Sequence, residues 1–428
     1  MKRRLTLRLA LIAVPIMSSA ACMQNTEDRS DYLRRAERLL DEVPLIDGHI
    51  DLPWVLRDKY ELDFAKLDIA RPQPQIMTDI PRLRAGKVGG VFWSTYTPSN
   101  FAGGIAARAG MEQNDVVHQM VARYPETFEL ARTADDIVRI FGAGKIASLI
   151  GLEGGHMIEN SLGALRAFHR DGVRYMTLTH SKNTDWADAA TDSTVHGGLT
   201  PFGEEVVREM NRLGMMVDLS HASDSTMLDV LRVTEAPVIF SHSSSRHFTP
   251  HKRNVPDDIA AMMTDNGGVI MVNYVASFTY LPAWERSQRR NALTRDLQAR
   301  GVDTTAALAE FDAADPPIPS TLSVIADHID YLRNLVGVDH VGIGSDLDGI
   351  ETPPEGLEDV STYPRLIAEL LARGWSDEDA KKLAGLNLLR VMREVETVAV
   401  RLRQERPASA AQIEMLDGWT SSPPWRTP

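Results

Sequence analysis

Pro44-Leu45-Ile46-Asp47-Gly48-His49-Ile50-Asp51-Leu52 is the stretch of this sequence that decides the fold. Its leucine and isoleucine residues form an apolar run of about the length of a buried β-strand. Side chains alternate between the two faces of a strand, so His49 and Asp51 point to the same side, just before Pro53. The stretch therefore predicts half of a metal site. A histidine and an aspartate at this spacing, taken alone, more often belong to a turn followed by an ordinary hydrogen-bonded histidine. The residues at the ends of the later strands therefore decide between this interpretation and a metal site.

Seven more apolar runs follow, and most of them end on a histidine or an acidic residue. These predicted strands cover residues 87–94, 146–152, 174–179, 215–220, 237–241, 268–273 and 340–345. The residues that end or directly follow the strands are His49, Asp51, Glu153, His180, His221, His242 and Asp346. Helical patterns separate the runs, at residues 104–124, 134–141, 161–170, 201–212, 224–232, 257–264 and 322–335.

Eight strands that alternate with helices predict a parallel sheet, and their number indicates a closed (β/α)8 barrel of the TIM type. Reactive residues of such barrels lie at the carboxyl ends of the strands, so we expect the seven polar residues to share one site. We expect the barrel at residues 43–397, after a tether and N-terminal helix at 22–42 and before a tail at 398–428 that packs on it irregularly. Residues 51–74 have a loop-like sequence, and one helix at 376–401 should cover the barrel.

Residues 276–320, between the seventh and eighth strands, are longer than a barrel loop requires. This insertion has a charged helical part at 284–300 and a proline-rich end at Pro316-Pro317-Ile318-Pro319. It leaves from the end of the barrel that holds the predicted site. Three interpretations stay open, namely a lid, an arm that joins a homodimer, and a plain surface insertion.

Residues 1–21 have the organisation of an export signal, with basic residues, an apolar stretch from Leu9 to Met17 and small residues at 18–21. The stretch is too short and too interrupted to span a membrane. It is followed by the only cysteine, Cys22, and resembles a bacterial lipoprotein signal in which that cysteine becomes the lipidated N-terminus, although Ser19 stands where leucine is usual. We expect a lipoprotein on the periplasmic side of a bacterial membrane, or alternatively a soluble periplasmic protein. A single cysteine permits no internal disulfide.

The composition excludes several classes of protein. A hydrophobic fraction of 43% with 25% charged residues is typical of a globular chain and not of a disordered one. The formal net charge is −13, and residues 1–21 contain four basic and no acidic residues, so the remainder is more acidic still. A nucleic-acid partner is therefore not expected.

The mixture of imidazoles and carboxylates suits zinc, and catalytic zinc keeps one position open. We hypothesise two ions bridged by Glu153, with His49 and Asp51 completing the ligands of one ion and His221 and His242 those of the other. A bridging hydroxide would then be the fourth ligand of each ion and the nucleophile, with the ions about 3.5–4 Å apart.

Two further residues have predicted catalytic roles. Asp346 would take the proton of the hydroxide and pass it to the leaving amine. His180 could be a sixth ligand, but with both sets of ligands complete it is better suited to donate to the oxyanion of a tetrahedral intermediate. His156 is interpreted as a surface or core histidine, and Asp348 as a turn residue.

Six sequence motifs resemble those of the membrane (renal) dipeptidase family of zinc peptidases. They are Asp47-Gly48-His49-Ile50-Asp51-Leu52-Pro53-Trp54, Glu153-Gly154-Gly155-His156, Leu178-Thr179-His180-Ser181-Lys182-Asn183, Phe240-Ser241-His242-Ser243-Ser244, Arg253-Asn254-Val255-Pro256-Asp257 and Gly344-Ser345-Asp346-Leu347-Asp348-Gly349. The resemblance implies an amidohydrolase-like, metal-dependent barrel from about Val43 to Glu396. It also implies that two zinc ions bind to His49, Asp51, Glu153, His221 and His242. His180 and Arg253 would bind the substrate, and Asp346 would act as the acid and base.

We therefore expect a zinc-dependent dipeptidase whose partner is a small dipeptide, with L,D-dipeptides among the candidate substrates. The lipid anchor would be its only contact with a membrane. Another amide or ester hydrolase of the amidohydrolase type is the first alternative. A lipid-anchored binding protein without catalysis is the second, and the presence of all five predicted ligands argues against it.

Overall fold

The computed structural model describes residues 29–101 and 104–418. The predicted export signal and Cys22 lie outside the described residues, as do Trp419 and Trp425 of the tail. Within the described ranges, no helix is long and apolar enough to cross a membrane.

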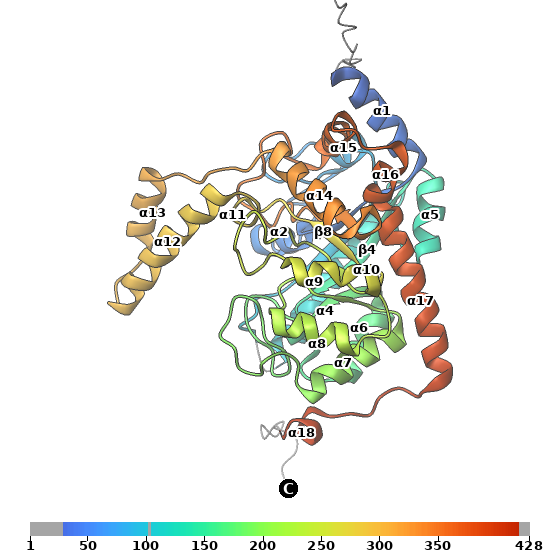
Figure 1. The fold of residues 1–428 in the computed structure, drawn as a ribbon, viewed down its shortest axis with the longest axis vertical. Coiled ribbons are helices and arrows are strands. Elements are labelled where there is room, and N and C mark those ends of the chain that lie inside the picture. The colour runs from blue at the N-terminus through green and yellow to red at the C-terminus, as the bar shows by residue number, and fades with distance from the viewer. Residues whose placement is uncertain (1–28, 102–103, 419–428) are drawn as a thin grey trace, which may run out of the picture.

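Eight parallel strands close into a barrel, which confirms the predicted fold (Figure 1). They are β1 (Leu45–Ile50), β2 (Val88–Tyr96), β4 (Ile146–Glu153), β5 (Val173–Thr177), β6 (Met216–Asp218), β7 (Ile239–Phe240), β8 (Val269–Val272) and β9 (Val341–Ile343). Their order around the barrel is β2, β1, β9, β8, β7, β6, β5 and β4, and pairing of β2 with β4 closes the ring. Every residue of β1 and β4 is buried, as expected for parallel strands that are covered on both faces.

A ninth strand, β3 (Phe128–Leu130), is absent from the sequence prediction. It pairs with the first residues of β4. The later residues of β4 pair with β5 along the same edge. A strand of three residues is too short to show a periodic pattern, which explains why the prediction missed it.

Helices surround the barrel at the predicted places. These are α1 (Arg29–Glu42), α4 (Ile105–Arg123), α5 (Ala134–Gly142), α6 (Leu162–Asp171), α7 (Pro201–Leu213), α8 (Asp224–Val233), α9 (Asp257–Ala261), α10 (Met263–Asn266) and α14 (Leu322–Val336). Several begin after a Ser or Thr whose side chain accepts a hydrogen bond from the first turn, as Thr133 does for α5 and Ser223 for α8. Such caps satisfy backbone N–H groups that have no partner inside the helix.

The prediction of a loop after Asp51 is wrong. Helix α2 (Leu52–Tyr60) begins directly after Asp51, and Pro53 lies in its first turn. Proline is tolerated there because the first N–H groups of a helix have no partner inside the helix. Helices α3 (Ile80–Ala85) and α15 (Tyr363–Ala372) are also absent from the prediction.

The helix predicted at 376–401 is interrupted. It consists of α16 (Asp377–Lys381), a π-helical turn at Lys382–Leu386 and α17 (Asn387–Glu405). The expected irregular tail is therefore helical as far as Glu405, and it contains one more short helix, α18 (Ile413–Leu416).

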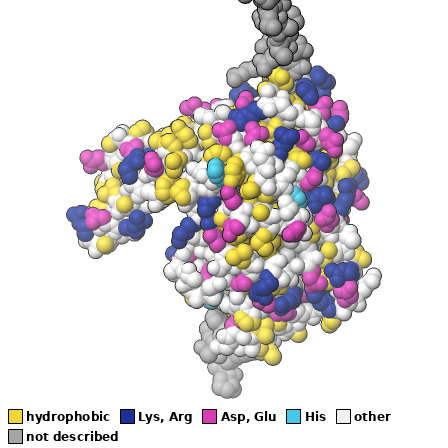
Figure 2. All heavy atoms as spheres, in the orientation of Figure 1, with side chains coloured by type: hydrophobic (Ala, Val, Ile, Leu, Met, Phe, Trp, Pro, Cys, Tyr) yellow, Lys and Arg dark blue, Asp and Glu magenta, His cyan; other side chains and the backbone are white. Residues whose placement is uncertain are grey.

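The insertion between β8 and β9 forms α11 (Ala276–Thr279), α12 (Leu281–Ala299) and α13 (Thr305–Ala314). In Figure 1, α12 and α13 project from the body as an arm. Arg286 and Arg290 of α12 both pair with Asp312 of α13 and hold the two helices together. Figure 2 shows charged side chains on the outer part of the arm and apolar side chains closer to the body.

Candidate active site

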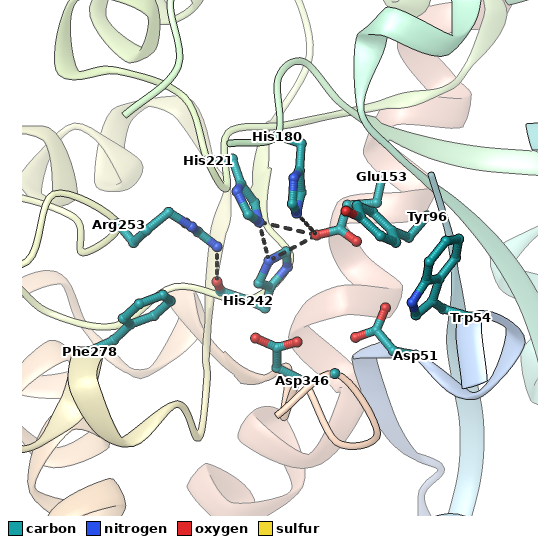
Figure 3. A pocket seen from close by; sticks show the side chains of 11 residues that line it. Asp51, Trp54, Tyr96, Glu153, His180, His221, His242, Arg253, Phe278 and Asp346 are labelled. Carbon is teal, nitrogen blue, oxygen red and sulfur yellow. Dashed lines mark hydrogen bonds and ion pairs between the residues drawn. The ribbon is translucent and has the colours of Figure 1, made fainter. Parts of the chain in front are cut away.

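The barrel brings the seven predicted polar residues together at the carboxyl ends of its strands, and Figure 3 shows all of them except His49. His49 lies in β1, Asp51 directly follows it, and Glu153 ends β4. The other four, His180, His221, His242 and Asp346, follow β5, β6, β7 and β9. A cavity of about 270 Å³ opens over the cluster and is lined by Asp51, Trp54, Tyr96, Glu153, His180, His221, His242, Arg253, Phe278, Asp346 and Gly349.

The carboxylate of Glu153 lies at the centre of the cluster, and its two oxygens have different histidine neighbours. Its Oε1 is 3.1 Å from Nε2 of His221 and 3.5 Å from Nε2 of His242. Its Oε2 is 3.6 Å from Nε2 of His49, which is in turn 3.5 Å from Oδ2 of Asp51. The two oxygens thus face candidate ligands on two sides, as those of a bridging carboxylate do, and His242 lies close enough to His49 and Glu153 to share an ion with them as well.

The separations between these atoms fit zinc. Ligand atoms that surround zinc tetrahedrally at about 2.0–2.1 Å lie roughly 3.3–3.4 Å from one another. The separations around Glu153 are close to this value, and Nε2 of His221 lies 3.0 Å from Nε2 of His242. The five residues predicted as ligands therefore have the chemistry and the spacing for two ions that share Glu153.

Two residues predicted to act on the substrate also lie within reach of the cluster. The possible ligand atoms of His180, Glu153 and His221 lie close enough together to hold a metal ion. The same is true of those of Asp346, His49 and Asp51. Nε2 of His180 is 3.7 Å from Oε1 of Glu153. Their positions therefore suit groups that act directly beside the metal site.

Tyr175 fixes the ring of His49 from inside the barrel. Its hydroxyl donates to the carbonyl of Gly48 at 3.1 Å, so the same oxygen accepts the Nδ1–H of His49 at 2.9 Å. In the neutral ring, this leaves Nε2 of His49 with a lone pair, as a metal ligand requires. Gly151 makes room for the tyrosine, because a Cβ there would lie 2.1 Å from the Tyr175 ring.

A similar chain of hydrogen bonds fixes His242. The hydroxyl of Ser241 donates to Oδ2 of Asp218 at 2.5 Å and therefore accepts the Nδ1–H of His242 at 2.8 Å. Asp218 is buried in β6 and also accepts hydrogen bonds from Thr177 and from the backbone N–H of Ser220. The second histidine thus also directs a lone pair into the cluster.

The backbone is strained where two of the site residues leave their strands. His221 has a φ of 68° and Asp346 a φ of 65°, in the left-handed region that residues with a Cβ rarely occupy. Such conformations cost about 1–3 kcal/mol each and persist only when the surroundings impose them. Thr179 donates to the carbonyl of His221 at 3.0 Å, and the N–H of Asp346 donates to the carbonyl of His49 at 3.0 Å.

The electrostatic environment favours neutral rings at His221 and His242 and charged groups at Glu153 and His49. Burial and the Arg253 guanidinium hold the pKa of His221 well below its ordinary value, and burial together with His49 does the same for His242. Burial alone would raise the pKa of Glu153, but His49 and the other imidazoles hold it well below its usual range. Burial alone would lower the pKa of His49, but Tyr175 and the carboxylates of Glu153 and Asp51 raise it well above its ordinary value, so binding of a metal to His49 would release a proton.

Asp346 has the opposite property. Burial and the neighbouring carboxylates of Asp51 and Glu153 raise the pKa of Asp346 well above its ordinary value. A carboxyl group with a raised pKa accepts a proton more readily, as the proton acceptor in general acid–base catalysis must.

Arg253 lies at one end of the cavity with 2% of its surface exposed. Its hydrogen bonds to Oγ of Ser243, at 3.4 Å, and to the carbonyl of His242, at 3.3 Å, are long, and its Nε has no partner among the described residues. Burial lowers the pKa of Arg253 to about 10, so the guanidinium stays charged at neutral pH. A buried cation with such weak partners suits an anionic ligand.

Some residues near the cluster have structural contacts instead. His156 forms a hydrogen bond from Nε2 to Oγ1 of Thr97 at 3.0 Å, and burial lowers the pKa of His156 to about 4. Asp348 has a φ of 66° and accepts the N–H of Met77 at 2.6 Å, as a turn residue can. These contacts agree with the interpretations made from the sequence.

The supporting residues Tyr175, Ser241 and Asp218 are absent from the site predicted from the sequence. A polar side chain inside an otherwise apolar strand was the available signal, since buried polar groups need partners. The aromatic residues of the cavity wall, Trp54, Tyr96 and Phe278, are absent from that prediction as well.

Comparison with known proteins gives consistent matches over most of the chain. The model of the membrane dipeptidase family, peptidase family M19, matches residues 33–406. Dipeptidase verJ of Clonostachys rogersoniana is 42% identical over 401 residues, which are 91% of this chain and 92% of the relative. Dipeptidase ataJ of Aspergillus terreus is 41% identical over 422 residues, which are 92% of this chain and 95% of the relative.

Two solved structures share the fold. The probable dipeptidase PvdM from Pseudomonas aeruginosa superimposes with a TM-score of 0.75 at 25% identity, over 86% of this chain and all of that one. A metallo peptidase from Rhodobacter sphaeroides, liganded with a phosphinate mimic of the dipeptide L-Ala-D-Ala, superimposes with a TM-score of 0.68 at 25% identity. That match covers 82% of this chain and 99% of the other.

The support that Tyr175 gives to His49 leads to a testable prediction. Tyr175→Phe keeps the ring that packs on Phe92 but removes the acceptor of the His49 Nδ1–H. Loss of such a partner typically lowers metal affinity about 10–100-fold. We expect a loss of that size when zinc affinity is measured by competition with a chelator. Tyr124→Phe, which removes a hydroxyl bonded to Asp68, is the matched control, and equal affinities of the two variants would contradict the role of Tyr175.

Proposed function

Because the chain belongs to the membrane dipeptidase family, peptidase family M19, and is a hydrolase that cleaves dipeptides, we propose that it acts through two zinc ions. The proposed ligands are His49, Asp51, Glu153, His221 and His242. The observation that carries this proposal is the placement of the two Glu153 oxygens, one toward each group of ligand atoms. The phosphinate complex of the Rhodobacter sphaeroides neighbour supports a dipeptide as the substrate.

When bound, zinc would supply a Lewis acid and an acidified water molecule, the predicted bridging hydroxide, as the nucleophile. The protein itself would move the proton. Asp346 lies beside His49 and Asp51, and its raised pKa suits a group that takes a proton and then delivers it to the leaving amine.

His180 would act on the carbonyl oxygen of the substrate. It lines the cavity, and burial together with Arg253 lowers its pKa, so the ring is neutral and carries one N–H. Its Nδ1 has no hydrogen-bond partner among the described residues, so the tautomer with the proton on Nε2, the atom that faces Glu153, is available. A donor at this place would stabilise the negative oxygen of the tetrahedral intermediate.

Arg253 would set the length of the substrate. Its guanidinium lies across the cavity from Trp54 and Asp51, with the histidine cluster between them (Figure 3). A dipeptide with its scissile bond at the cluster brings its terminal carboxylate to the guanidinium, which can bind it through two hydrogen bonds. A longer peptide would place an uncharged amide there and leave the buried cation without an anion.

We also propose that the protein is exported and anchored by a lipid on Cys22. The basic, apolar and small-residue regions before Cys22 support this. The alternative is a soluble periplasmic form cleaved near the same place.

The first prediction of this proposal concerns the metal. Metal analysis of the purified protein should give about two zinc ions per chain, because one carboxylate bridges two sets of ligands. Glu153→Ala should lose both zinc affinity and activity, whereas Glu129→Ala, a change on the outer strand β3, should lose neither. A single zinc ion in fully active protein would show that Glu153 does not bridge two ions.

The second prediction concerns Arg253. Arg253→Ala and C-terminal amidation of a good dipeptide each remove one partner of a desolvated charge pair, which costs about 3–5 kcal/mol, or roughly a 10²–10³-fold loss or more in kcat/KM. Because both changes remove the same contact, combining them should cost little more than either alone. Additive losses, or tripeptide hydrolysis as fast as dipeptide hydrolysis, would falsify this role.

The third prediction concerns the anchor. Cys22→Ser should abolish labelling by a fatty-acid probe and release the protein into the soluble periplasm, since the lipid would be its only attachment to the membrane. Labelling and fractionation of cells that express each form would measure this. Unchanged membrane association of the variant would count against lipidation.

A further inference from the structure

Phe278 is the point at which the insertion between β8 and β9 reaches the active site. It lies in α11, and within the described residues of the insertion it is the one that lines the cavity. The guanidinium carbon of Arg253 is 5.4 Å from the centre of the Phe278 ring. The aromatic ring therefore lies directly beside the group that is proposed to hold the substrate carboxylate.

The ring is held in place from several sides. The imidazole of His251 packs on it with the ring centres 4.2 Å apart. The carbonyl of Phe278 accepts a hydrogen bond from Nδ2 of the buried Asn254 at 2.6 Å, and the next carbonyl, that of Thr279, is bonded to Nε2 of the buried His328 at 2.9 Å. The first turn of the insertion is thus a fixed wall of the cavity.

The cavity has a second aromatic wall at its other end. Trp54 and Tyr96 meet edge to face there, with ring centres 4.9 Å apart, close to Asp51. Figure 3 shows Phe278 and Arg253 on one side of the cluster and Trp54 and Asp51 on the other. A dipeptide that spans the cluster would therefore have its N-terminal residue near Trp54 and its C-terminal residue near Phe278.

We infer that Phe278 determines which C-terminal residues the enzyme accepts, by limiting the size of the side chain next to the substrate carboxylate. This inference rests on the proposed function, because it places that carboxylate on Arg253. The side chain and the carboxylate of an amino acid share one carbon atom. A side chain whose carboxylate is bound to Arg253 must therefore lie close to the ring that covers the guanidinium. Beside a ring whose backbone is fixed, glycine or alanine should fit better than leucine or phenylalanine.

The test compares dipeptides that share an N-terminal residue and carry Gly, Ala, Leu or Phe at the C-terminus. Discrimination of a methylene group in an apolar pocket amounts to about 10–200-fold. In Phe278→Ala we expect the ratio of kcat/KM for the Leu dipeptide to that for the Gly dipeptide to rise at least about 10-fold over wild type. Phe278→Leu should give an intermediate ratio, because its side chain is smaller than Phe and larger than Ala.

Trp54→Ala is the matched control, since it removes an aromatic side chain from the opposite wall. It should change the preference for the N-terminal residue and leave the ratio of Leu to Gly at the C-terminus as in wild type. Zinc content and thermal unfolding of each variant identify a misfolded protein, and Phe278→Leu is available if Phe278→Ala does not fold. An unchanged C-terminal ratio in folded, zinc-loaded Phe278 variants would overturn the inference. A wild-type enzyme that cleaves none of the dipeptides would instead overturn the proposed function.

Discussion

The contact between the Glu153 carboxylate and the imidazoles around it is the interaction on which the site depends. Glu153 ends a strand that is buried along its whole length, and it is paired in register with Tyr96 of β2. Burial of a carboxylate is costly unless the charge is compensated. The surrounding imidazoles compensate part of it, and each comes from a different strand end, so the barrel must hold these ends in register for the charge to be tolerated.

Two buried aspartates beneath the site hold neighbouring strand ends in register by hydrogen bonds. Asp47 accepts the N–H groups of His49 at 2.8 Å and of Ser345 at 3.0 Å, and thereby joins β1 to the end of β9. Asp218 joins β6 to the end of β7 through the N–H and hydroxyl groups of Ser241. Burial raises the pKa of both aspartates. These contacts fix the backbone before any ligand binds, so the left-handed residues that follow β6 and β9 are held by contacts already present in the fold.

The sequence allowed prediction of the barrel because its strands are apolar runs separated by amphipathic helices, and of the site because the polar residues follow those runs. Pro53 was misleading, since proline ends a strand and also begins a helix. Tyr175 lies in an apolar run and looks like a core residue, so its bond to His49 becomes visible only when β5 and β1 face each other across the barrel. Phe278 could not be assigned, because the path of a long insertion depends on tertiary contacts such as the one with Asn254.

The proposed contacts select a substrate by two different physical effects. Length would depend on charge, because Arg253 is a buried cation with weak hydrogen bonds and the terminal carboxylate of a dipeptide supplies its missing partner. A longer peptide could make the same apolar contacts and would still leave this cation unpaired. The choice of C-terminal side chain would depend instead on the space beside the Phe278 ring, which also covers the Arg253 guanidinium at 5.4 Å. The two effects are therefore separable through the substrate, since amidation of a dipeptide removes its carboxylate and leaves the space beside Phe278 unchanged.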